Sequence, residues 1–161
     1  MDHDTPAIDF SNKSRGYDEL ASQLQGLLDG EHHRIANAAN AAALLYGALP
    51  DVNWVGFYFM EFTELVVGPF QGNPACVRIP LGRGVCGQAA ARQVTILVRD
   101  VHAFSDHITC DVASNSEIVV PLIRGNELLG VLDVDSPKLA RFDGEDQAGL
   151  ERLARIYVNS L

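Results

Sequence analysis

The sequence predicts an α+β fold, in which a central antiparallel β-sheet carries helices packed at both ends of the chain. Apolar residues recur with helical spacing before residue 50 and again over residues 143–158. Between them lie short runs of β-branched and aromatic residues, separated by turn residues as in hairpin-connected strands. The length of 161 residues suits one domain, so we expect a flexible arm over residues 1–15 and a single folded domain over residues 16–161.

Composition and charge exclude several classes of protein. Hydrophobic residues make up 47% of the chain and charged residues 20%, which is typical of a globular protein. A net charge of −9 argues against a nucleic-acid partner, because phosphate binding needs a basic surface. No apolar run approaches the roughly 18 residues of a membrane span, and the acidic start is unlike a signal peptide, so we expect a cytoplasmic protein without a membrane partner. Three cysteines argue against a structural disulfide framework and leave reactive thiols as the alternative.

Two amphipathic helices are predicted before the first strand. The first starts near Tyr17 and ends at residues 29–30, and the second ends before Pro50. Their apolar faces contain Leu20, Leu24, Leu27 and Leu28 in the first helix, and Ile35, Ala38, Ala42, Leu45 and Leu49 in the second. Because alanine lets another helix approach closely, we expect a homodimer in which these two helices and the last one meet their copies.

A strand over residues 53–60 is the first candidate for a ligand-binding surface. Alternation places Trp54, Gly56 and Tyr58 on one face, where two rings beside a glycine would wall a recess. A buried core strand is the commoner reason for such a pattern. Further strands are expected over residues 64–70 and 76–79.

Residues 82–92 form a glycine loop that opens a helix, and a short strand follows over residues 95–98. The loop lacks the spacing and the lysine of a phosphate-binding motif. It places Cys86 at a helix N-terminus, where the backbone dipole favours a thiolate. A small residue in a tight corner explains Cys86 equally well.

The polar stretch 105–117 has no helical or strand period and contains Cys110 among histidine and aspartate residues. Loops on a firm scaffold often carry function, which makes Cys110 a candidate reactive thiol. On composition alone, Cys110 is one of many small residues in a surface loop. The rest of the sequence reverses that interpretation.

A hairpin of two strands, over residues 118–123 and 128–135, follows this loop, and a closing helix covers residues 143–158. Asp133 and Asp135 share a face at a strand end, where aspartate is disfavoured; they mark either a functional site or a frayed terminus. The register of the hairpin decides whether Glu117 joins them. A two-residue turn puts Glu117 and Asp133 on opposite faces, whereas a loop with an odd number of residues or a bulge puts them together, and these alternatives stay open.

Seven motifs resemble the free methionine-R-sulfoxide reductases, which are single GAF domains. They are residues 54–58 (WVGFY), 65–72 (LVVGPFQG), 75–76 (AC), 84–87 (GVCG), 107–111 (HITCD), 116–121 (SEIVVP) and 130–136 (GVLDVDS). The resemblance covers about residues 17–159. It implies a GAF-like fold and thiol-dependent reduction of free L-methionine (R)-S-oxide, with thioredoxin as external reductant and no cofactor or metal.

The resemblance also implies roles for particular residues. Cys110 would be the nucleophile that becomes a sulfenic acid, with Cys76 and Cys86 as candidate resolving thiols that form an intramolecular disulfide with it. The substrate would be bound and activated by Glu117, Asp133 and Asp135, with Trp54 and Tyr58 as the pocket walls. Two positions depart from the family pattern: Asn73 replaces an expected lysine, and residues 104–107 (FSDH) replace a Phe-Pro-Gly-His loop.

Two other functions are compatible with parts of the sequence. A GAF domain can be a small-molecule or redox sensor without turnover, although sensors usually accompany an output domain. A zinc site made of His102, His107 and Cys110 is the third hypothesis. Its spacing is loose, it lacks a Cys-x-x-Cys pair, and it leaves the acidic residues unexplained.

Overall fold

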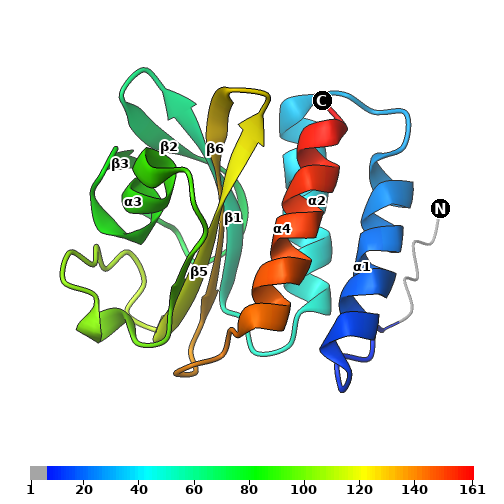
Figure 1. Cartoon of the computed structure of the whole chain (residues 1–161), viewed down its shortest axis with the longest axis horizontal. Coiled ribbons are helices and arrows are strands. Elements are labelled where there is room, and N and C mark those ends of the chain that lie inside the picture. The colour runs from blue at the N-terminus through cyan, green and yellow to red at the C-terminus, as the bar shows by residue number, and fades with distance from the viewer. Residues whose placement is uncertain (1–6) are drawn as a thin grey trace.

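The computed structural model describes residues 7–161 and confirms the predicted fold class. The elements are α1 (Lys13–Leu28), α2 (Arg34–Ala48), β1 (Trp54–Glu61), β2 (Glu64–Gly72), β3 (Arg78–Pro80), α3 (Gly84–Arg92), β4 (Ile96–Val98), the 3₁₀ turn η1 (Val101–Ala103), β5 (Ser116–Arg124), β6 (Glu127–Ser136) and α4 (Gly144–Asn159). The strands form one antiparallel sheet in the order β3-β2-β1-β6-β5-β4. Figure 1 shows α2 and α4 on one face of the sheet with α1 outside them, and α3 on the opposite face.

The folded domain begins before residue 16, where the sequence placed its boundary. The Asn12 side chain accepts a hydrogen bond from the Arg15 amide at 3.1 Å, so α1 starts at Lys13. Ile8 and Phe10 pack against the hydrophobic core, and the Phe10 ring meets the Tyr17 ring edge-on. The structure therefore packs part of the expected arm, residues 7–15, against the domain, and the rest of the arm lies outside the described residues. Over residues 7–161 no helix combines the length and the apolar character that a membrane span requires.

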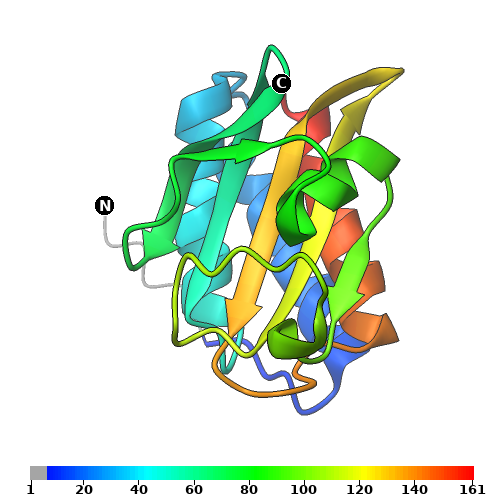
Figure 2. The same ribbon diagram turned by 90° about the vertical axis from the view of Figure 1, so that its left-hand side faces the viewer.

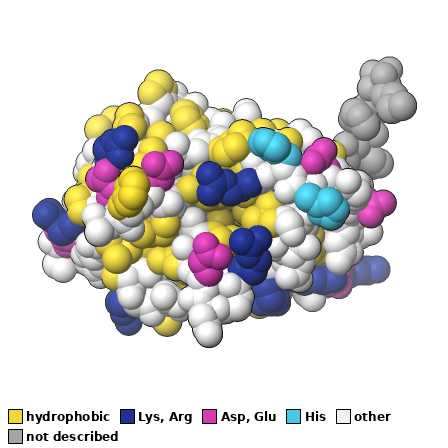
Figure 3. Space-filling model, turned by 90° about the horizontal axis from the view of Figure 1, so that it is seen from above, with side chains coloured by type: hydrophobic (Ala, Val, Ile, Leu, Met, Phe, Trp, Pro, Cys, Tyr) yellow, Lys and Arg dark blue, Asp and Glu magenta, His cyan; other side chains and the backbone are white. Residues whose placement is uncertain are grey.

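The alanine-rich face of α2 is part of the chain's own core. Ala38, Ala42 and Leu45 are at most 1% exposed and pack with residues of the sheet, α1 and α4. This face is not available to a second copy, so the reason given for a homodimer is wrong. Ile35 and Tyr46 are the large hydrophobic residues of α2 that remain exposed. Figure 3 shows one end of the molecule, where hydrophobic side chains are interspersed with Lys and Arg. The homodimer stays a prediction, which light scattering would test.

The alternation predicted for β1 is confirmed. Val55 and Phe57 belong to the core beneath the helices, whereas Trp54 and Tyr58 belong to a second cluster on the α3 face. The Trp54 ring stacks on Tyr58, with 5.8 Å between the ring centroids. Gly56 lies beneath the Trp54 ring: a Cβ atom at this position would come 2.6 Å from the indole. The glycine therefore lets the indole lie flat against the sheet.

A bulge in β6 settles the register that the sequence left open. Ile123 pairs with Leu128 next to the two-residue turn, but Leu122 pairs with Gly130, so Leu129 is the extra residue. Beyond the bulge Glu117 lies opposite Asp135, and Val119 lies opposite Asp133. Directly opposed residues in an antiparallel pair share a face. The bulge therefore brings all three acidic side chains to one face of the sheet.

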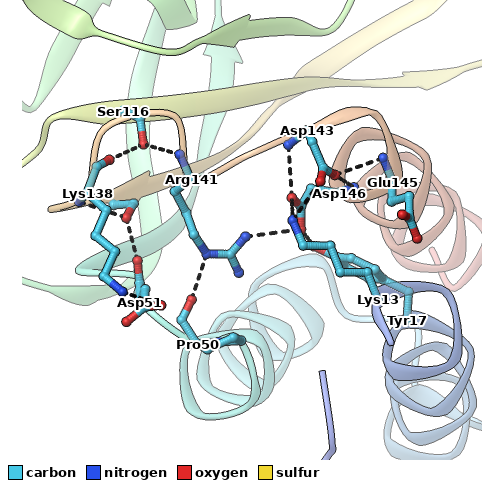
Figure 4. A network of polar contacts seen from close by, with 11 residues as sticks. Lys13, Tyr17, Pro50, Asp51, Ser116, Lys138, Arg141, Asp143, Glu145 and Asp146 are labelled. Carbon is cyan, nitrogen blue, oxygen red and sulfur yellow. Dashed lines mark hydrogen bonds and ion pairs between the residues drawn. The ribbon is translucent and has the colours of Figure 1, made fainter. Parts of the chain in front are cut away.

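A network of polar contacts joins the helices to the ends of β5 and β6 (Figure 4). The Asp146 carboxylate is fully buried and accepts hydrogen bonds from Tyr17 Oη at 2.8 Å, Lys13 Nζ at 2.7 Å and Arg141 Nη1 at 3.2 Å. Arg141 Nε also donates to the Pro50 carbonyl at 2.9 Å. The network thus ties α1, the end of α2 and the start of α4 to one point.

Two serine residues extend this network to the acidic side chains. Ser116 and Ser136 are opposite each other in the sheet and fully buried. Their hydroxyls donate to the carbonyls of Lys138 and Asp51. Because each serine adjoins an acidic residue of the same strand, these bonds fix the strand ends that carry Glu117 and Asp135.

We expect Asp146→Ala to lower the free energy of unfolding by about 3–5 kcal/mol, because it leaves Arg141 and Lys13 without their buried counter-ion. Urea unfolding measures the change. Asp18→Ala is the matched control, since it removes a carboxylate that joins α1 to Arg152 of α4 at the surface and should cost below about 1 kcal/mol. Equal losses in the two variants would contradict the role of the buried network.

Candidate active site

A cavity of about 40 Å³ lies on the face of the sheet opposite α2 and α4, where α3 and the loop before β5 cover the strands. Figure 2 shows this loop crossing in front of the sheet, below α3. The predicted site residues that line the cavity are Trp54, Tyr58, Cys86, Cys110, Glu117, Asp133 and Asp135. Cys76 joins them through a covalent bond to Cys110. The structure therefore brings together every residue that the sequence predicted for the site.

Three carboxyl groups form the acidic floor of the cavity. Glu117 and Asp133 are buried, and Asp135 is partly exposed. The pKa of each is raised well above its ordinary value, first by burial and then by another acidic residue: Asp133 acts on Glu117, Asp135 on Asp133, and Glu117 on Asp135. Within the described chain, no donor reaches Oδ1 of Asp133 or Oδ1 of Asp135. The floor therefore combines acids that retain protons with two carboxyl oxygens that no group outside the acidic cluster and Cys86 satisfies.

Cys76 and Cys110 form a disulfide, with their Cα atoms 5.4 Å apart and a sequence separation of 34. The bond connects the loop after β2 to the loop before β5. Both cysteines are partly exposed at the rim of the cavity, not buried on its floor. Of the two candidate partners that the sequence left open for Cys110, the structure pairs it with Cys76.

Cys86 is the free cysteine of the described chain, and it is buried. Its Sγ lies 3.9 Å from Glu117 Oε1. The pKa of the thiol is raised well above its ordinary value, chiefly by burial and then by Asp133 and Glu117. A helix dipole contributes typically ~0.3–1 kcal/mol, whereas full burial can shift a pKa by several units. The expectation that α3 favours a Cys86 thiolate is therefore wrong, because burial among carboxyl groups outweighs the dipole.

The two aromatic walls also position the loop that carries Cys76. Tyr58 Oη donates a hydrogen bond to the Cys76 carbonyl at 3.2 Å. Trp54 Nε1 donates to the Asn73 carbonyl at 3.1 Å. Both side chains are about 2% exposed, so their polar ends are satisfied by these backbone contacts. The rings therefore bound the cavity in a fixed orientation.

Sequence reasoning missed the residues that fasten the loop before β5. The Asp111 carboxylate accepts hydrogen bonds from the side-chain amides of Asn53, at 3.3 Å, and Asn73, at 3.4 Å. Asp106 accepts hydrogen bonds from Arg83 Nε and from the Gly84 amide, both at 3.1 Å. Asn73 and Asp106 are among the positions where the chain departs from the family pattern. Both serve to fix the loop, and no local sequence signal marks such long-range contacts.

The structure contradicts the zinc hypothesis. Cys110 is bound to Cys76, and the His102 ring pairs with Asp100 at 2.9 Å. Over residues 7–161 the one group of side chains close enough to share a metal ion is Cys86, Glu117 and Asp133, whose donor atoms lie within 4.8 Å of one another. A cation there would have to displace protons from three groups with raised pKa values.

Comparisons with known proteins agree with this geometry. Residues 23–161 match the family model described as GAF domain. The chain is 53% identical over 142 residues to a free methionine-R-sulfoxide reductase of Escherichia coli, covering 88% of this chain and 86% of the relative. It is 39% identical over 169 residues to a free methionine-R-sulfoxide reductase of Saccharomyces cerevisiae, covering 98% and 94%.

Solved structures are similar as well. The X-ray structure of free methionine-R-sulfoxide reductase from Neisseria meningitidis, in complex with its substrate, superposes with a TM-score of 0.91 at 46% identity. The match covers 95% of this chain and 92% of the Neisseria meningitidis chain. The reduced form of the Staphylococcus aureus protein has a TM-score of 0.88 at 49% identity, and the match covers 90% of this chain and 94% of that one.

The acidic floor predicts how stability depends on pH. Because the folded state holds protons that the unfolded chain releases near pH 4 to 4.5, it binds more protons above this range, and the free energy of unfolding falls as the pH rises. The slope is about 1.4 kcal/mol per pH unit for each such group. We expect Asp133→Asn to reduce this slope and to stabilise the oxidised protein at pH 8 by at least about 1 kcal/mol.

Urea unfolding between pH 5 and pH 8 measures the effect. Asp18→Asn removes one exposed carboxylate and is the control for the change in net charge. If both variants have the slope of the unsubstituted protein, the carboxyl groups of the floor are not held protonated by folding.

Proposed function

Since this chain belongs to the free methionine-R-sulfoxide reductase family of GAF domains, we propose that it reduces free L-methionine (R)-S-oxide to L-methionine. The observation that carries the proposal is the Cys76–Cys110 disulfide at the rim of a cavity floored by three carboxyl groups. Reduction of a sulfoxide needs a thiolate and a proton donor, and Cys110 and the three carboxyl groups that line this cavity are suited to the two roles.

Cys110 is the nucleophile of the proposed reaction. Its partly exposed position lets water stabilise a thiolate, whereas Cys86 is enclosed by acidic groups that oppose one. The Cys110 thiolate attacks the sulfoxide sulfur, and the oxygen is transferred to the cysteine. One thiolate, one sulfoxide and one proton thus give methionine and Cys110 sulfenic acid.

Glu117 supplies the proton in this scheme. It is buried, its pKa is raised by burial and by Asp133, and it lines the cavity that Cys110 borders. A carboxylic acid that stays protonated near neutral pH can act as a general acid for the sulfoxide oxygen. Once the proton has left, the Glu117 carboxylate remains on the cavity floor.

Cys76 resolves the sulfenic acid. Its thiol attacks Cys110, which releases water and forms the disulfide between the two loops. This assignment is supported by the pairing of these two cysteines and by the burial of Cys86 beside Glu117. An external dithiol of the thioredoxin type then reduces the disulfide, so that the cycle consumes one sulfoxide and one dithiol and yields methionine, water and a disulfide.

Asp133 and Asp135 bind the α-ammonium group of the free amino acid. Both present an Oδ1 atom that lacks a donor within residues 7–161. A cationic donor would satisfy these oxygens and lower the cost of ionising the carboxyl groups. The fixed rings of Trp54 and Tyr58 limit the positions of the substrate methyl group, and this restriction selects one epimer of the sulfoxide.

We expect Cys110→Ser to abolish methionine formation, because a hydroxyl is a weak nucleophile towards sulfur and forms no sulfenic acid. Cys76→Ser should retain a single turnover and accumulate a sulfenic acid that dimedone traps. Cys86→Ser should retain steady-state turnover with a dithiol, since Cys86 takes no part in the exchange. Rapid quenching and mass spectrometry of the labelled peptide distinguish the three variants.

The assignment fails in either of two cases. Activity of Cys110→Ser at the rate of the unsubstituted enzyme would exclude Cys110 as the nucleophile. A disulfide between Cys86 and Cys110 in the oxidised enzyme, with normal turnover of Cys76→Ser, would make Cys86 the resolving thiol.

Substrate selectivity should depend on the free amine. N-acetyl-methionine sulfoxide leaves Asp133 and Asp135 without a cation, and a site built around a polar contact can reject an analogue that lacks it by as much as ~10⁴–10⁵-fold. Rates of methionine formation from the free amino acid, its separated epimers and the acetylated compound measure this preference. Comparable rates for the free and acetylated compounds would remove the ammonium-binding role of the acidic residues.

A further inference from the structure

Glu117 faces a different group with each of its carboxyl oxygens. Oε1 lies 3.9 Å from the Cys86 thiol, and Oε2 lies 3.9 Å from Nε2 of His107. The remaining neighbours of the carboxyl group are Asp133 and Asp135. The side chain of Glu117 is 9% exposed, so few routes connect it to bulk water.

Three of these four neighbours are poor sources of a replacement proton. Asp133, Asp135 and Cys86 have raised pKa values, and Asp133 and Cys86 are buried. Each would become a charged group beside the other acids if it gave up its proton. Proton transfer among these groups moves the negative charge from one to another, but the cluster still lacks one proton.

His107 differs in exposure and in chemistry. Its side chain is 13% exposed and lies in the loop before β5, the segment that covers the cavity. Nδ1 lies 3.4 Å from the hydroxyl of Thr109, an exposed residue. The two ring nitrogens therefore point to different surroundings: Nε2 towards Glu117 and Nδ1 towards the surface.

We propose that His107 is a proton relay that returns a proton from solvent to Glu117 after each turnover. The inference rests on the proposed function, in which Glu117 gives its proton to the sulfoxide oxygen. Imidazole can release a proton at one nitrogen while it accepts one at the other, which few side chains can do near neutral pH.

The proton balance of the relay is simple. Nε2–H gives its proton to the Glu117 carboxylate once the two groups close from 3.9 Å to hydrogen-bond distance, and Nδ1 takes a proton from water through the Thr109 end of the ring. Glu117 ends protonated and the ring ends as the neutral Nδ1–H tautomer, from which proton exchange with water restores the Nε2–H tautomer before the next turnover. Burial lowers the pKa of His107, with a smaller contribution from His102, so the ring is neutral at rest and is ready to exchange tautomers.

His107→Gln separates the relay from the first chemical step. At equilibrium Glu117 is already protonated, so one turnover should proceed at the rate of the unsubstituted enzyme. Later turnovers should be slower by ~10²-fold, the lower end of what a positioned proton-transfer group contributes. Rapid-quench methionine release measures the first turnover, and consumption of a saturating dithiol measures the steady state. Added imidazole should restore the steady state of His107→Gln but not of Glu117→Gln.

Two further variants complete the design. His102→Asn removes the neighbouring exposed histidine, which pairs with Asp100, and should keep both rates. Thr109→Val removes the hydroxyl beside Nδ1 and should lower the steady-state rate with an intact first turnover, which keeps a test available if His107→Gln is unstable.

The relay is overturned if His107→Gln keeps the normal steady-state rate, or if it loses the first turnover to the same extent as later ones. Failure of imidazole to raise the rate of His107→Gln also counts against it. Failure of the proposed function has a different signature, because the unsubstituted enzyme would then release no methionine in the first turnover.

Discussion

The site depends on a single constraint: three carboxyl groups are placed on one buried face of the sheet, where they raise one another's pKa. Such a cluster opposes folding at neutral pH, because each proton that it retains is one the unfolded chain would release. The rest of the molecule compensates for this cost. The helices bury a continuous apolar core, and Ser116 and Ser136 tie the strand ends beside the acids to two loops. The destabilised site is thus supported by a scaffold on the opposite face of the same strands.

The hairpin register shows how narrowly this arrangement is specified. Because of one extra residue, Leu129, Glu117 lies opposite Asp135; without it, Glu117 would lie opposite Val134. Without the bulge, the Glu117 side chain would point towards the helices, into the apolar core that Val134 occupies. An unpaired carboxyl group there would cost several kcal/mol, which is a large part of the roughly 5–15 kcal/mol by which a typical domain is stable. The bulge is therefore a requirement of the site as well as of the strand geometry.

Periodicity and turn residues were sufficient to predict the fold class, most of the helices and strands, and the two faces of β1. They were not sufficient for properties set by tertiary contacts. The alanines of α2 indicate close packing, but only the fold shows that the sheet and neighbouring helices occupy that face. Cys86 is at a helix N-terminus as predicted, yet its acidic neighbours come from strands more than thirty residues away. The choice of Cys76 as the partner of Cys110 depends likewise on two loops that meet in space.

The cavity offers two different environments, one that suits a thiolate and one that suits a protonated carboxylic acid. A thiolate needs water or positive charge, whereas a carboxylic acid stays protonated only where charge is disfavoured. The structure places Cys76 and Cys110 at the partly exposed rim and the acids on the floor, so that a substrate between them meets both environments. The same separation gives Cys86 its character, since a thiol on the floor is kept protonated like the acids around it. It also creates the need for a proton path from rim to floor, and His107 is the titratable side chain of the loop that contacts both.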